Sequence, residues 1–449
     1  MNTYDVVVIG AGYAGLTATR HLLKANKNVL LLEARDRVGG RVFTQNLDSG
    51  TYVDLGGAWI GPTQDHIYAL AREFGVETFP TYDTGKSTQY FRGKIKRYGG
   101  LIPPLPIGAL LSLDAAIKRM NKLAKSINLA APWQSPNANY WDAMTLASWM
   151  HQQMSFQTAR DFFKVAAEAI WAADPADISM LHALFYVQSA GSLELLMNTK
   201  GGAQEERIVG GAQTIANKMA ATFADKICFN SPVKTILQEG AGVKIIAKEK
   251  EYGAKKVIVA IPPTLAGRID YQPIMPANRD SLTQRMPMGS VWKTYAIYDK
   301  PFWRDAGLNA LVATPNGYIT VTFDNSPKDG SKGILMGFVL GNQAKAFSEL
   351  SAAQRRQEAL AAFTTFFGKK AQNPVQYLDH SWATEEWSRG CYAGVMPPGV
   401  WTSVGKTLRA PVGHIHWAGT ETAEVWNGYI EGAVRSGERV AKEILECLA

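Results

Sequence analysis

The sequence predicts an α/β fold in which a Rossmann-like domain is interleaved with an α+β domain. The first indication lies in residues 6–33, where a hydrophobic strand, a glycine-rich turn, a helix and a second strand follow one another as in a βαβ unit. The second is that segments of this style return near residues 208–229 and 415–420, after long stretches of a different character. We therefore expect two domains, each built from separate parts of the chain.

The composition is that of an ordinary folded protein. At about 150 residues per domain, a chain of 449 residues suggests two or three domains. A hydrophobic content of 46% and a charged content of 19% argue against disorder. The formal charge of +8 arises from 47 Lys and Arg against 39 Asp and Glu, without a long basic run, so we expect no nucleic-acid binding.

The cysteine content and the hydropathy suggest where the protein works. Cys228, Cys391 and Cys447 are too few and too dispersed for a disulfide framework, so we expect a reducing compartment, the cytoplasm. The first strand begins too near Met1 to leave room for a signal peptide. No run approaches about 18 apolar residues, and the chain ends at Ala449 just after a helix, so we expect no membrane anchor.

The glycine-rich turn at the start of the chain is suited to a dinucleotide. Gly10 permits a tight turn, Gly12 lets the backbone approach a pyrophosphate, and Gly15 allows close packing of helix on strand. The N-terminus of the helix offers free N–H groups to the anion. Glu33 ends the second strand, where a carboxylate can accept hydrogen bonds from a ribose. Alone, this stretch fits NAD as well as FAD.

Two further glycine-containing stretches follow the βαβ unit. Residues 34–41 form a turn in which Gly39 and Gly40 lie between arginines, and such a turn can bring N–H groups and a guanidinium to a second phosphate. A solvated basic loop is the alternative. Residues 53–61 are a second glycine-rich run after a short strand, where the backbone can also come close to a ligand. This second run favours phosphate binding by residues 34–41 over a solvated loop.

Patterning predicts the remaining elements in outline. Helical periodicity runs through residues 110–129, 145–154, 159–172, 212–223, 352–367 and 428–448. Strands are expected at 226–229, 257–261, 291–298, 318–323, 333–340 and 415–417, with a hairpin formed by 233–238 and 243–248.

Taken together, these residues resemble the flavin-dependent amine oxidases, most closely the monoamine oxidase branch, over nearly the whole chain. The motifs that carry the resemblance are Val8–Glu33, Arg35–Arg41, Asp54–Gly57, Gly201–Glu205, Met288–Lys293, Ser388–Tyr392, Gly419–Thr422 and Gly428–Gly432. The resemblance implies the FAD-binding fold that amine oxidases share with glutathione reductase. It places the FAD-binding domain at 1–80, 207–281 and 385–449, and the substrate domain at 81–206, expected to be helical, and 282–384.

The resemblance also implies the residues that hold FAD. They are Gly10, Gly12, Gly15, Glu33, Ala34, Arg35, Gly40, Arg41, Gly57, Ala58, Trp59, Val233, Cys391, Gly419, Thr420, Glu421, Tyr429 and Ile430. In the family, the cysteine of a Ser-Gly-Gly-Cys-Tyr motif is joined to the flavin by a thioether, which implies the same link at Cys391. Arg389 stands where the family has the first of these glycines, and an outward displacement of the loop would leave FAD bound without the link.

The residues implied to act on the substrate are few. Tyr392 and Tyr429 match the two tyrosines that face each other before the flavin and align the amine. Lys293 matches the lysine that holds a water at flavin N5, and a buried ammonium there stabilises negative charge developing on oxygen. Gln204 matches a glutamine of the substrate pocket. No metal is expected, because the few histidines lack ligand spacing.

The expected reaction is oxidative deamination of a primary amine to an aldehyde, ammonia and hydrogen peroxide, with oxygen as the oxidant. Few acids occur in residues 81–200, which contain Trp171, Phe185 and Tyr186, and this favours an aromatic or apolar amine over a diamine or polyamine. An amino-acid oxidase would need a cation for the substrate carboxylate, for which Arg304 and Arg207 are candidates by charge alone. A non-catalytic flavin-binding scaffold is the alternative from another class. The oligomeric state stays open, with a homodimer as one arrangement.

Overall fold

The larger of the two main sheets is built around the first strand of the chain. The computed structural model describes residues 2–48, 50–100 and 102–448. Strand β1 (Asn2–Ile9) pairs in parallel with β2 (Val29–Leu32) on one side and β13 (Lys250–Val259) on the other. The sheet continues through β10 (Ile227–Cys228), β12 (Gly242–Ala247), β11 (Val233–Glu239), β14 (Asp270–Gln272) and β20 (Ile415–Trp417).

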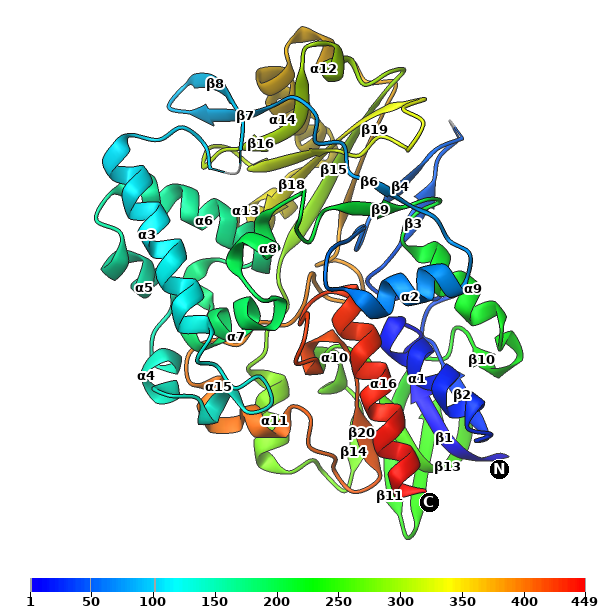
Figure 1. The fold of residues 1–449 in the computed structure, drawn as a ribbon. Coiled ribbons are helices and arrows are strands. Elements are labelled where there is room, and N and C mark those ends of the chain that lie inside the picture. The colour runs from blue at the N-terminus through cyan, green and yellow to red at the C-terminus, as the bar shows by residue number, and fades with distance from the viewer. Residues whose placement is uncertain (1, 49, 101, 449) are drawn as a thin grey trace.

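Helices from both ends of the chain cover this sheet. Helix α1 (Tyr13–Lys24) packs along α16 (Ile430–Cys447), so the two termini lie close together at the lower right of Figure 1. A Cβ atom at Gly437 would lie 2.4 Å from the carbonyl oxygen of Ala14, which shows how closely the two helices approach. This side is completed by α2 (Asp65–Glu73) and α9 (Gln213–Ala221).

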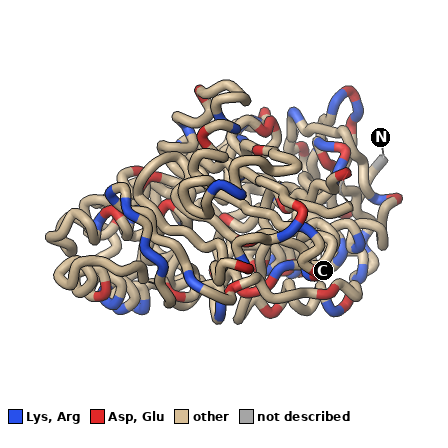
Figure 2. The backbone as a smooth tube through the Cα atoms, turned by 90° about the horizontal axis from the view of Figure 1, so that it is seen from above, with Lys and Arg blue, Asp and Glu red and all other residues tan. Residues whose placement is uncertain are grey.

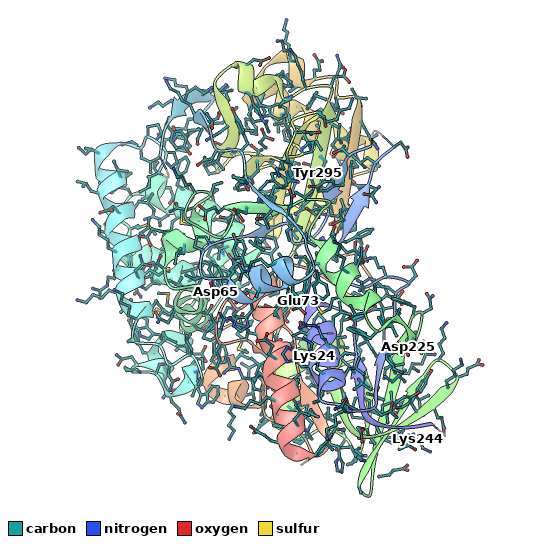
Figure 3. All side chains as sticks on the ribbon, turned by 45° about the vertical axis from the view of Figure 1, so that its right-hand side comes forward. Lys24, Asp65, Glu73, Asp225, Lys244 and Tyr295 are labelled. Carbon is teal, nitrogen blue, oxygen red and sulfur yellow. The ribbon has the colours of Figure 1, made fainter. Side chains whose placement is uncertain are left out.

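Charged side chains join these helices. Lys24 of α1 lies 3.8 Å from Glu73 of α2, as the neighbouring labels in Figure 3 indicate. The fully buried carboxylate of Glu431 accepts the N–H groups of His66 (3.2 Å) and Ile67 (2.8 Å) at the start of α2. Since the first N–H groups of a helix lack partners within it, Glu431 fixes α2 to the start of α16.

The second main sheet lies above the first in Figure 1. Its strand order is β19 (Gln376–Ser381), β15 (Val291–Tyr298), β18 (Gly333–Leu340), β17 (Val321–Asp324), β16 (Leu308–Ala313), β7 (Lys86–Phe91) and β8 (Lys94–Tyr98). All eight residues of β15 are buried. Because side chains alternate along a strand, Val291, Lys293 and Tyr295 share one face, and Trp292 and Tyr298 pack in the core on the other.

Helices fill the left of Figure 1 and flank the second sheet. They are α3 (Ile107–Ala124), α4 (Ala138–Asp142), α5 (Leu146–Gln153), α6 (Gln157–Trp171), α7 (Met180–Ala190) and α8 (Leu193–Met197). The other helices are α10 (Pro263–Ala266), α11 (Ala277–Gln284), α12 (Phe302–Asp305), α13 (Gly341–Ser348), α14 (Ala352–Phe367) and α15 (Val400–Val404), of which α12 and α14 lie at the top of Figure 1. Short 3₁₀ turns are η1 (Pro132–Gln134), η2 (Pro175–Asp177), η3 (Ala224–Lys226), η4 (Lys369–Ala371), η5 (Gly405–Thr407) and η6 (Thr420–Thr422). Small sheets pair β3 (Thr44–Asn46) with β4 (Tyr52–Asp54), and β9 (Glu206–Ile208) with β5 (Trp59–Ile60) and β6 (Thr78–Pro80).

The expected α/β fold with a Rossmann-like unit is confirmed, and one expectation about the chain is wrong. Residues 81–206 are not helical throughout, because β7 and β8 form a hairpin whose strand β7 pairs with β16 of the second sheet. The expected hairpin of β11 and β12 is present, and α16 begins at Ile430 rather than at residue 428. The division into five segments stays a prediction, and its outer limits, Met1 and Ala449, lie outside the described residues.

Charged residues are distributed over the whole fold, and the helices are those of a protein with ordinary hydropathy. Lys and Arg are scattered over the backbone, as are Asp and Glu, with long stretches of other residues between them (Figure 2). Within residues 2–48, 50–100 and 102–448, no helix is long and apolar enough to cross a membrane.

Candidate active site

A cavity of about 590 Å³ runs from the β1–α1 turn to the helices beside the second sheet. Nearly all the predicted site residues line it: Gly10, Gly12, Glu33, Ala34, Arg35, Gly40, Arg41, Gly57, Ala58, Trp59, Gln204, Val233, Lys293, Cys391, Tyr392, Gly419, Thr420, Tyr429 and Ile430. Gly15 and Glu421 are absent from the lining. One cavity therefore brings together residues from both main sheets.

The β1–α1 turn presents bare backbone to the cavity. Gly10 has φ +98°, and a Cβ atom there would lie 2.7 Å from the Ile261 side chain, so a larger residue would be both strained and crowded. Gly12 precedes α1 with no side-chain cap, which leaves the first N–H groups of the helix free for an anion. A backbone bridge between Gly12 and Gly39 brings the 34–41 turn against this helix end.

Glu33 is held in place by main-chain donors. Its carboxylate accepts the N–H groups of Ala11 (2.7 Å) and Arg35 (2.9 Å), and the side chain is buried. A carboxylate has about four acceptor positions, so it can still accept ribose hydroxyls. The Arg35 guanidinium donates to Ser388 Oγ (2.8 Å) and lies 3.4 Å from Glu385, which ties the loop before Cys391 to this end of the cavity.

Arg41 and Glu421 form a buried ion pair that supports the loop carrying Tyr392. The Nη1 atom of Arg41 lies 2.6 Å from Glu421 Oε1 and donates to the Tyr392 carbonyl oxygen (2.8 Å). Burial alone would raise the pKa of Glu421, but the Arg41 guanidinium outweighs it and holds the pKa below its ordinary value. The carboxylate also accepts the Gly394 N–H (3.1 Å). Glu421 therefore holds the loop that carries Tyr392 in place without lining the cavity itself.

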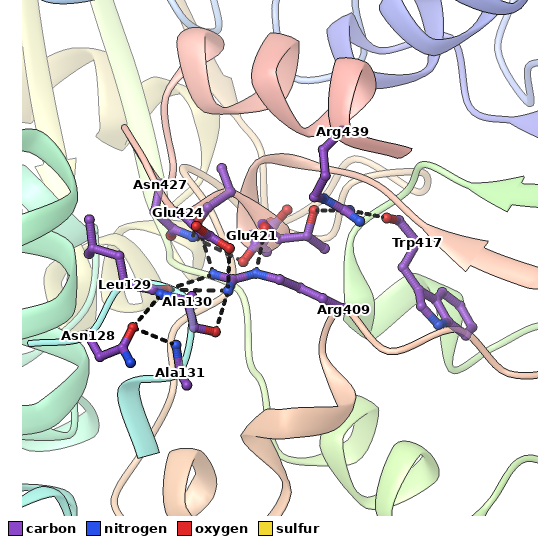
Figure 4. A network of polar contacts seen from close by, with 12 residues as sticks. Asn128, Leu129, Ala130, Ala131, Arg409, Trp417, Glu421, Glu424, Asn427 and Arg439 are labelled. Carbon is purple, nitrogen blue, oxygen red and sulfur yellow. Dashed lines mark hydrogen bonds and ion pairs between the residues drawn. The ribbon is translucent and has the colours of Figure 1, made fainter. Parts of the chain in front are cut away.

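The loop before α16, residues 418–429, is fastened from outside by two arginines (Figure 4). Arg409 donates to the carbonyl oxygens of Ala130 (2.9 Å) and Thr422 (2.8 Å) and pairs with Glu424 (3.2 Å). Arg439 donates to the Trp417 carbonyl oxygen (2.5 Å). These contacts connect the loop to residues near η1, on the helical side of the molecule.

Lys293 projects from β15 toward this loop and the glycine run. Its Nζ atom donates to the carbonyl oxygens of Asp54 (3.0 Å) and Gly56 (2.5 Å). The rings of Trp59 and Phe338 each have their centres 5.4 Å from Nζ. Burial lowers the pKa of this lysine from its ordinary value to about 8.

Cys391 lines the cavity as a buried thiol, and burial raises its pKa to about 12. Its N–H donates to the Gly289 carbonyl oxygen (3.0 Å), which fixes the loop against the end of β15. Arg389 also lines the cavity but is exposed, with φ +56°, a conformation that glycine adopts most easily. The loop accommodates Arg389 while Cys391 remains buried.

Aromatic rings and one amide line the part of the cavity around Tyr429. The Tyr429 ring lies 4.8 Å from the centre of Trp426 and 6.1 Å from Tyr186, and Tyr392 meets Phe338 edge-on at 6.2 Å. Gln204 donates to the Leu196 carbonyl oxygen (3.2 Å), and its Oε1 atom is buried without a partner among the described residues. That acceptor is available to a ligand's N–H or O–H group.

The lining also includes Lys234 and Arg268, and a separate part of the cavity is lined by apolar side chains. These apolar side chains come from α3, α6, α8, β16 and β17: Leu113, Ile117, Phe162, Phe163, Val165, Ile170, Leu193, Leu196, Met197, Val312, Val321 and Phe323. Among the described residues, Glu33 and Glu386 are the acidic residues of the lining. Glu33 lies at the β1–α1 end, and Glu386 belongs to the loop that Arg35 holds.

Sequence reasoning missed several residues around Lys293. Phe338 of β18 and His380 of β19 pair directly with Lys293 across the sheet. Each belongs to a strand whose hydrophobicity is visible in the sequence, but the register that places it beside Lys293 is not. Asp54 belongs to a recognised motif, yet nothing in the sequence indicates that its carbonyl oxygen accepts a hydrogen bond from the lysine.

The fold and this cavity define a dinucleotide-binding oxidoreductase of the flavin type, since a glycine cradle, a buried acid at the end of β2 and a tyrosine- and lysine-lined chamber share one space. The sequence pattern of the family described as flavin containing amine oxidoreductase matches residues 13–445. The chain belongs to this family, as its motifs predicted, and it is an amine oxidoreductase that uses FAD.

Relatives support the assignment over the whole length. AofH of Mycobacterium tuberculosis, a candidate flavin-containing monoamine oxidase, is 41% identical over 446 residues, which span 99% of this chain and 97% of the relative. The structure of putrescine oxidase bound to putrescine has a TM-score of 0.95 at 33% identity and covers 99% of each chain. Cyclohexylamine oxidase from Brevibacterium oxydans has a TM-score of 0.95 at 32% identity, with the same coverage.

Proposed function

We propose that this amine oxidase acts on primary amines that carry an aromatic or apolar group. The observation that carries the proposal is the apolar part of the cavity, where the described residues offer no carboxylate to a second ammonium. The products would be an aldehyde, ammonia and hydrogen peroxide, with oxygen as the electron acceptor. Burying an unpaired charge is strongly unfavourable, so a diamine would bind this chamber poorly.

The residues of the chain would divide the work as follows. FAD, when bound, would supply the redox chemistry: a hydride equivalent, which carries two electrons, would leave the α-carbon of the amine for the flavin, and oxygen would then take up two electrons. Tyr392 and Tyr429 would hold the neutral amine between their rings, and Gln204 Oε1 would accept a hydrogen bond from it. The Lys293 ammonium would stabilise negative charge that develops on oxygen.

Three rival functions are less well supported. An amino acid needs a cation for its carboxylate, but Arg304 pairs with Asp324 at 2.7 Å, Arg207 donates to Ser326, and neither arginine lines the cavity. A diamine would find no carboxylate for its second ammonium among the described residues of the apolar chamber, although putrescine oxidase shares the fold. A flavin-binding scaffold would have no need of a lysine with a lowered pKa beside two tyrosines in one cavity.

Peroxide release measured with four classes of compound tests the proposal. Purified enzyme is given benzylamine, phenethylamine, putrescine or an aromatic amino acid in parallel. We expect the two aromatic amines to respond most strongly. Peroxide released with putrescine alone would make the enzyme a diamine oxidase, and peroxide released with the amino acid alone would make it an amino-acid oxidase. No peroxide with any of the four compounds would favour the non-catalytic scaffold.

Replacing Tyr392 or Tyr429 by leucine should lower amine turnover about 10- to 100-fold, because the amine loses both the π-faces and its alignment. The flavin absorbance of the purified variants should stay unchanged. Steady-state oxygen consumption measures the effect, with exposed Tyr140→Leu as the control. Wild-type kinetics in both variants would remove these tyrosines from the mechanism.

We also propose that FAD is attached to Cys391 through a thioether. The buried thiol shares the cavity with Lys293 and Tyr392, and the neighbouring Arg389 does not displace it. Acid precipitation should therefore leave the yellow colour in the wild-type pellet and release it from Cys391→Ala. Colour released from both proteins would show that FAD is held without a covalent bond.

A cytoplasmic location and a homodimer are further proposals. The location is supported by three cysteines that are all free, as is usual in a reducing compartment. Cell fractionation and sedimentation of the purified holoenzyme test the two proposals separately.

A further inference from the structure

Asp54, at the end of β4, is a fully buried acid with no part in the reaction described above. Its Oδ1 atom accepts hydrogen bonds from Thr44 Oγ1 (2.6 Å) and the Ala212 N–H (2.9 Å). Oδ2 is buried and has no partner among the described residues. Burial raises the pKa of this acid above its ordinary value, and the charge of Arg207 and the two donors on Oδ1 oppose that rise and favour the ionised form. A protonated Oδ2 would lack an acceptor for its hydrogen.

The main chain of the same residue contacts the site. The Asp54 carbonyl oxygen accepts hydrogen bonds from Lys293 Nζ (3.0 Å) and from the Tyr295 hydroxyl (2.5 Å). Tyr295 belongs to β15 in the second sheet, where Figure 3 labels it. The carboxylate fixes Asp54 to β3 and to the start of α9, and thereby directs its carbonyl oxygen at the lysine.

The ionisable groups that face Lys293 come from four elements. They are Asp54 of β4, Arg207 of β9, Cys391 of the loop after β19, and His380 of β19. Burial raises the pKa of Cys391 to about 12 and lowers that of His380, so both side chains are neutral near pH 7. The charges that act on Lys293 at neutral pH are then those of Asp54 and Arg207.

These two charges have opposite effects on the lysine. The Arg207 guanidinium is buried and donates to Ser326 (2.7 Å) and Asn325 (3.3 Å), with no ion pair within the described part of the chain. It favours a neutral lysine, and Asp54 favours a charged one. Lys293 is buried, with the rings of Trp59 and Phe338 centred 5.4 Å from Nζ, so both charges are screened less than charges at the surface.

We propose that Asp54 is a positioning residue for Lys293: its carbonyl oxygen fixes the Nζ atom beside the cofactor site, and its carboxylate keeps that side chain charged. The link to catalysis rests on the proposed function, because it is there that the charged lysine assists the reaction of oxygen. The geometry around Asp54 is independent of that role.

NMR of holoenzyme with ¹³C-labelled lysine tests the proposal directly. The Lys293 signal, assigned by its loss in Lys293→Met, should titrate near pH 8 in the wild type. In Asp54→Asn, which keeps an acceptor for Thr44 and Ala212, the midpoint should fall by about one unit or more. Asp299→Asn, which removes a surface carboxylate just after β15, the strand that carries Lys293, should leave the midpoint unchanged. An unmoved midpoint in Asp54→Asn would overturn the proposal.

A neutron crystal structure of the wild-type holoenzyme near neutral pH tests the same inference without a variant. We expect three deuterons on Lys293 Nζ and none on Asp54, and a deuteron on Asp54 Oδ2 would overturn the inference. The rate at which oxygen reacts with the reduced enzyme is then followed against pH in wild type and Asp54→Asn. A shifted NMR midpoint without a shifted oxygen profile would support the role of Asp54 and contradict the oxygen role of Lys293.

Discussion

Lys293→Met is expected to slow the reaction of the reduced enzyme with oxygen about 100- to 1,000-fold, as the loss of one well-placed electrostatic group does in other enzymes. The ammonium is fixed by the carbonyl oxygens of Asp54 and Gly56 and lies beside the ring of Trp59, so its charge is held in one place within a buried site. Reduction of the flavin by amine without oxygen should change far less, because methionine fills a similar volume.

Stopped-flow absorbance separates the two half-reactions. The control is Lys300→Met, which removes an exposed ammonium just beyond the same strand. Equal losses in both half-reactions would mean that Lys293 shapes the whole site, and an unchanged oxygen step would exclude its proposed role.

The same lysine predicts how the oxygen step depends on pH. Burial lowers its pKa from the ordinary value to about 8, so Lys293 is charged below this pH and loses its proton as the pH rises through it. The oxygen rate should therefore fall as the pH rises through about 8, whereas an exposed lysine would keep its charge beyond pH 10. A rate that is constant from pH 7 to about 9 would contradict this assignment.

The sequence predicts the cofactor side of this molecule well because its signals are local. Gly10, Gly12 and Glu33 act within one βαβ unit, where the order of strand, turn and helix determines the geometry. The membership of the FAD-dependent amine oxidase family could be predicted because several of its motifs occur in the family's order along this chain. The hairpin of β7 and β8 was missed because its strand β7 pairs with β16, more than 200 residues further along the chain.

Contacts between segments that lie far apart in the chain could not be predicted for the same reason. Glu421 lies in a recognised motif, but the structure shows its carboxylate on Arg41, 380 residues away. Lys293 and Asp54 each belong to a motif, and their contact depends on how β15 lies over the glycine run. Long-range contacts of this kind depend on sheet register and on burial, and a single sequence records neither.

Gly15→Ala is expected to destabilise the protein by about 3 kcal/mol, because the added methyl group cannot be accommodated. A Cβ atom at this position would lie 1.9 Å from the Gly10 carbonyl oxygen, and main-chain atoms in a buried turn have little room to move. Chemical unfolding of the protein measures the loss. A change below about 1 kcal/mol would mean that α1 moves away from β1 without strain.

Gly12→Ala provides a matched comparison within the same motif. A Cβ atom at Gly12 would approach no closer than 4.0 Å to another part of the chain, so the flavin-free variant should unfold at nearly the same denaturant concentration as flavin-free wild type. Its methyl group would instead occupy space that the pyrophosphate of FAD needs, because the backbone at Gly12 faces the cavity. We therefore expect Gly12→Ala to fold normally and to be purified with little FAD, as measured by the ratio of flavin to protein absorbance. Wild-type flavin content in Gly12→Ala would show that the pyrophosphate does not approach the chain here. The two substitutions together distinguish a glycine that packing requires, Gly15, from a glycine that the ligand requires, Gly12.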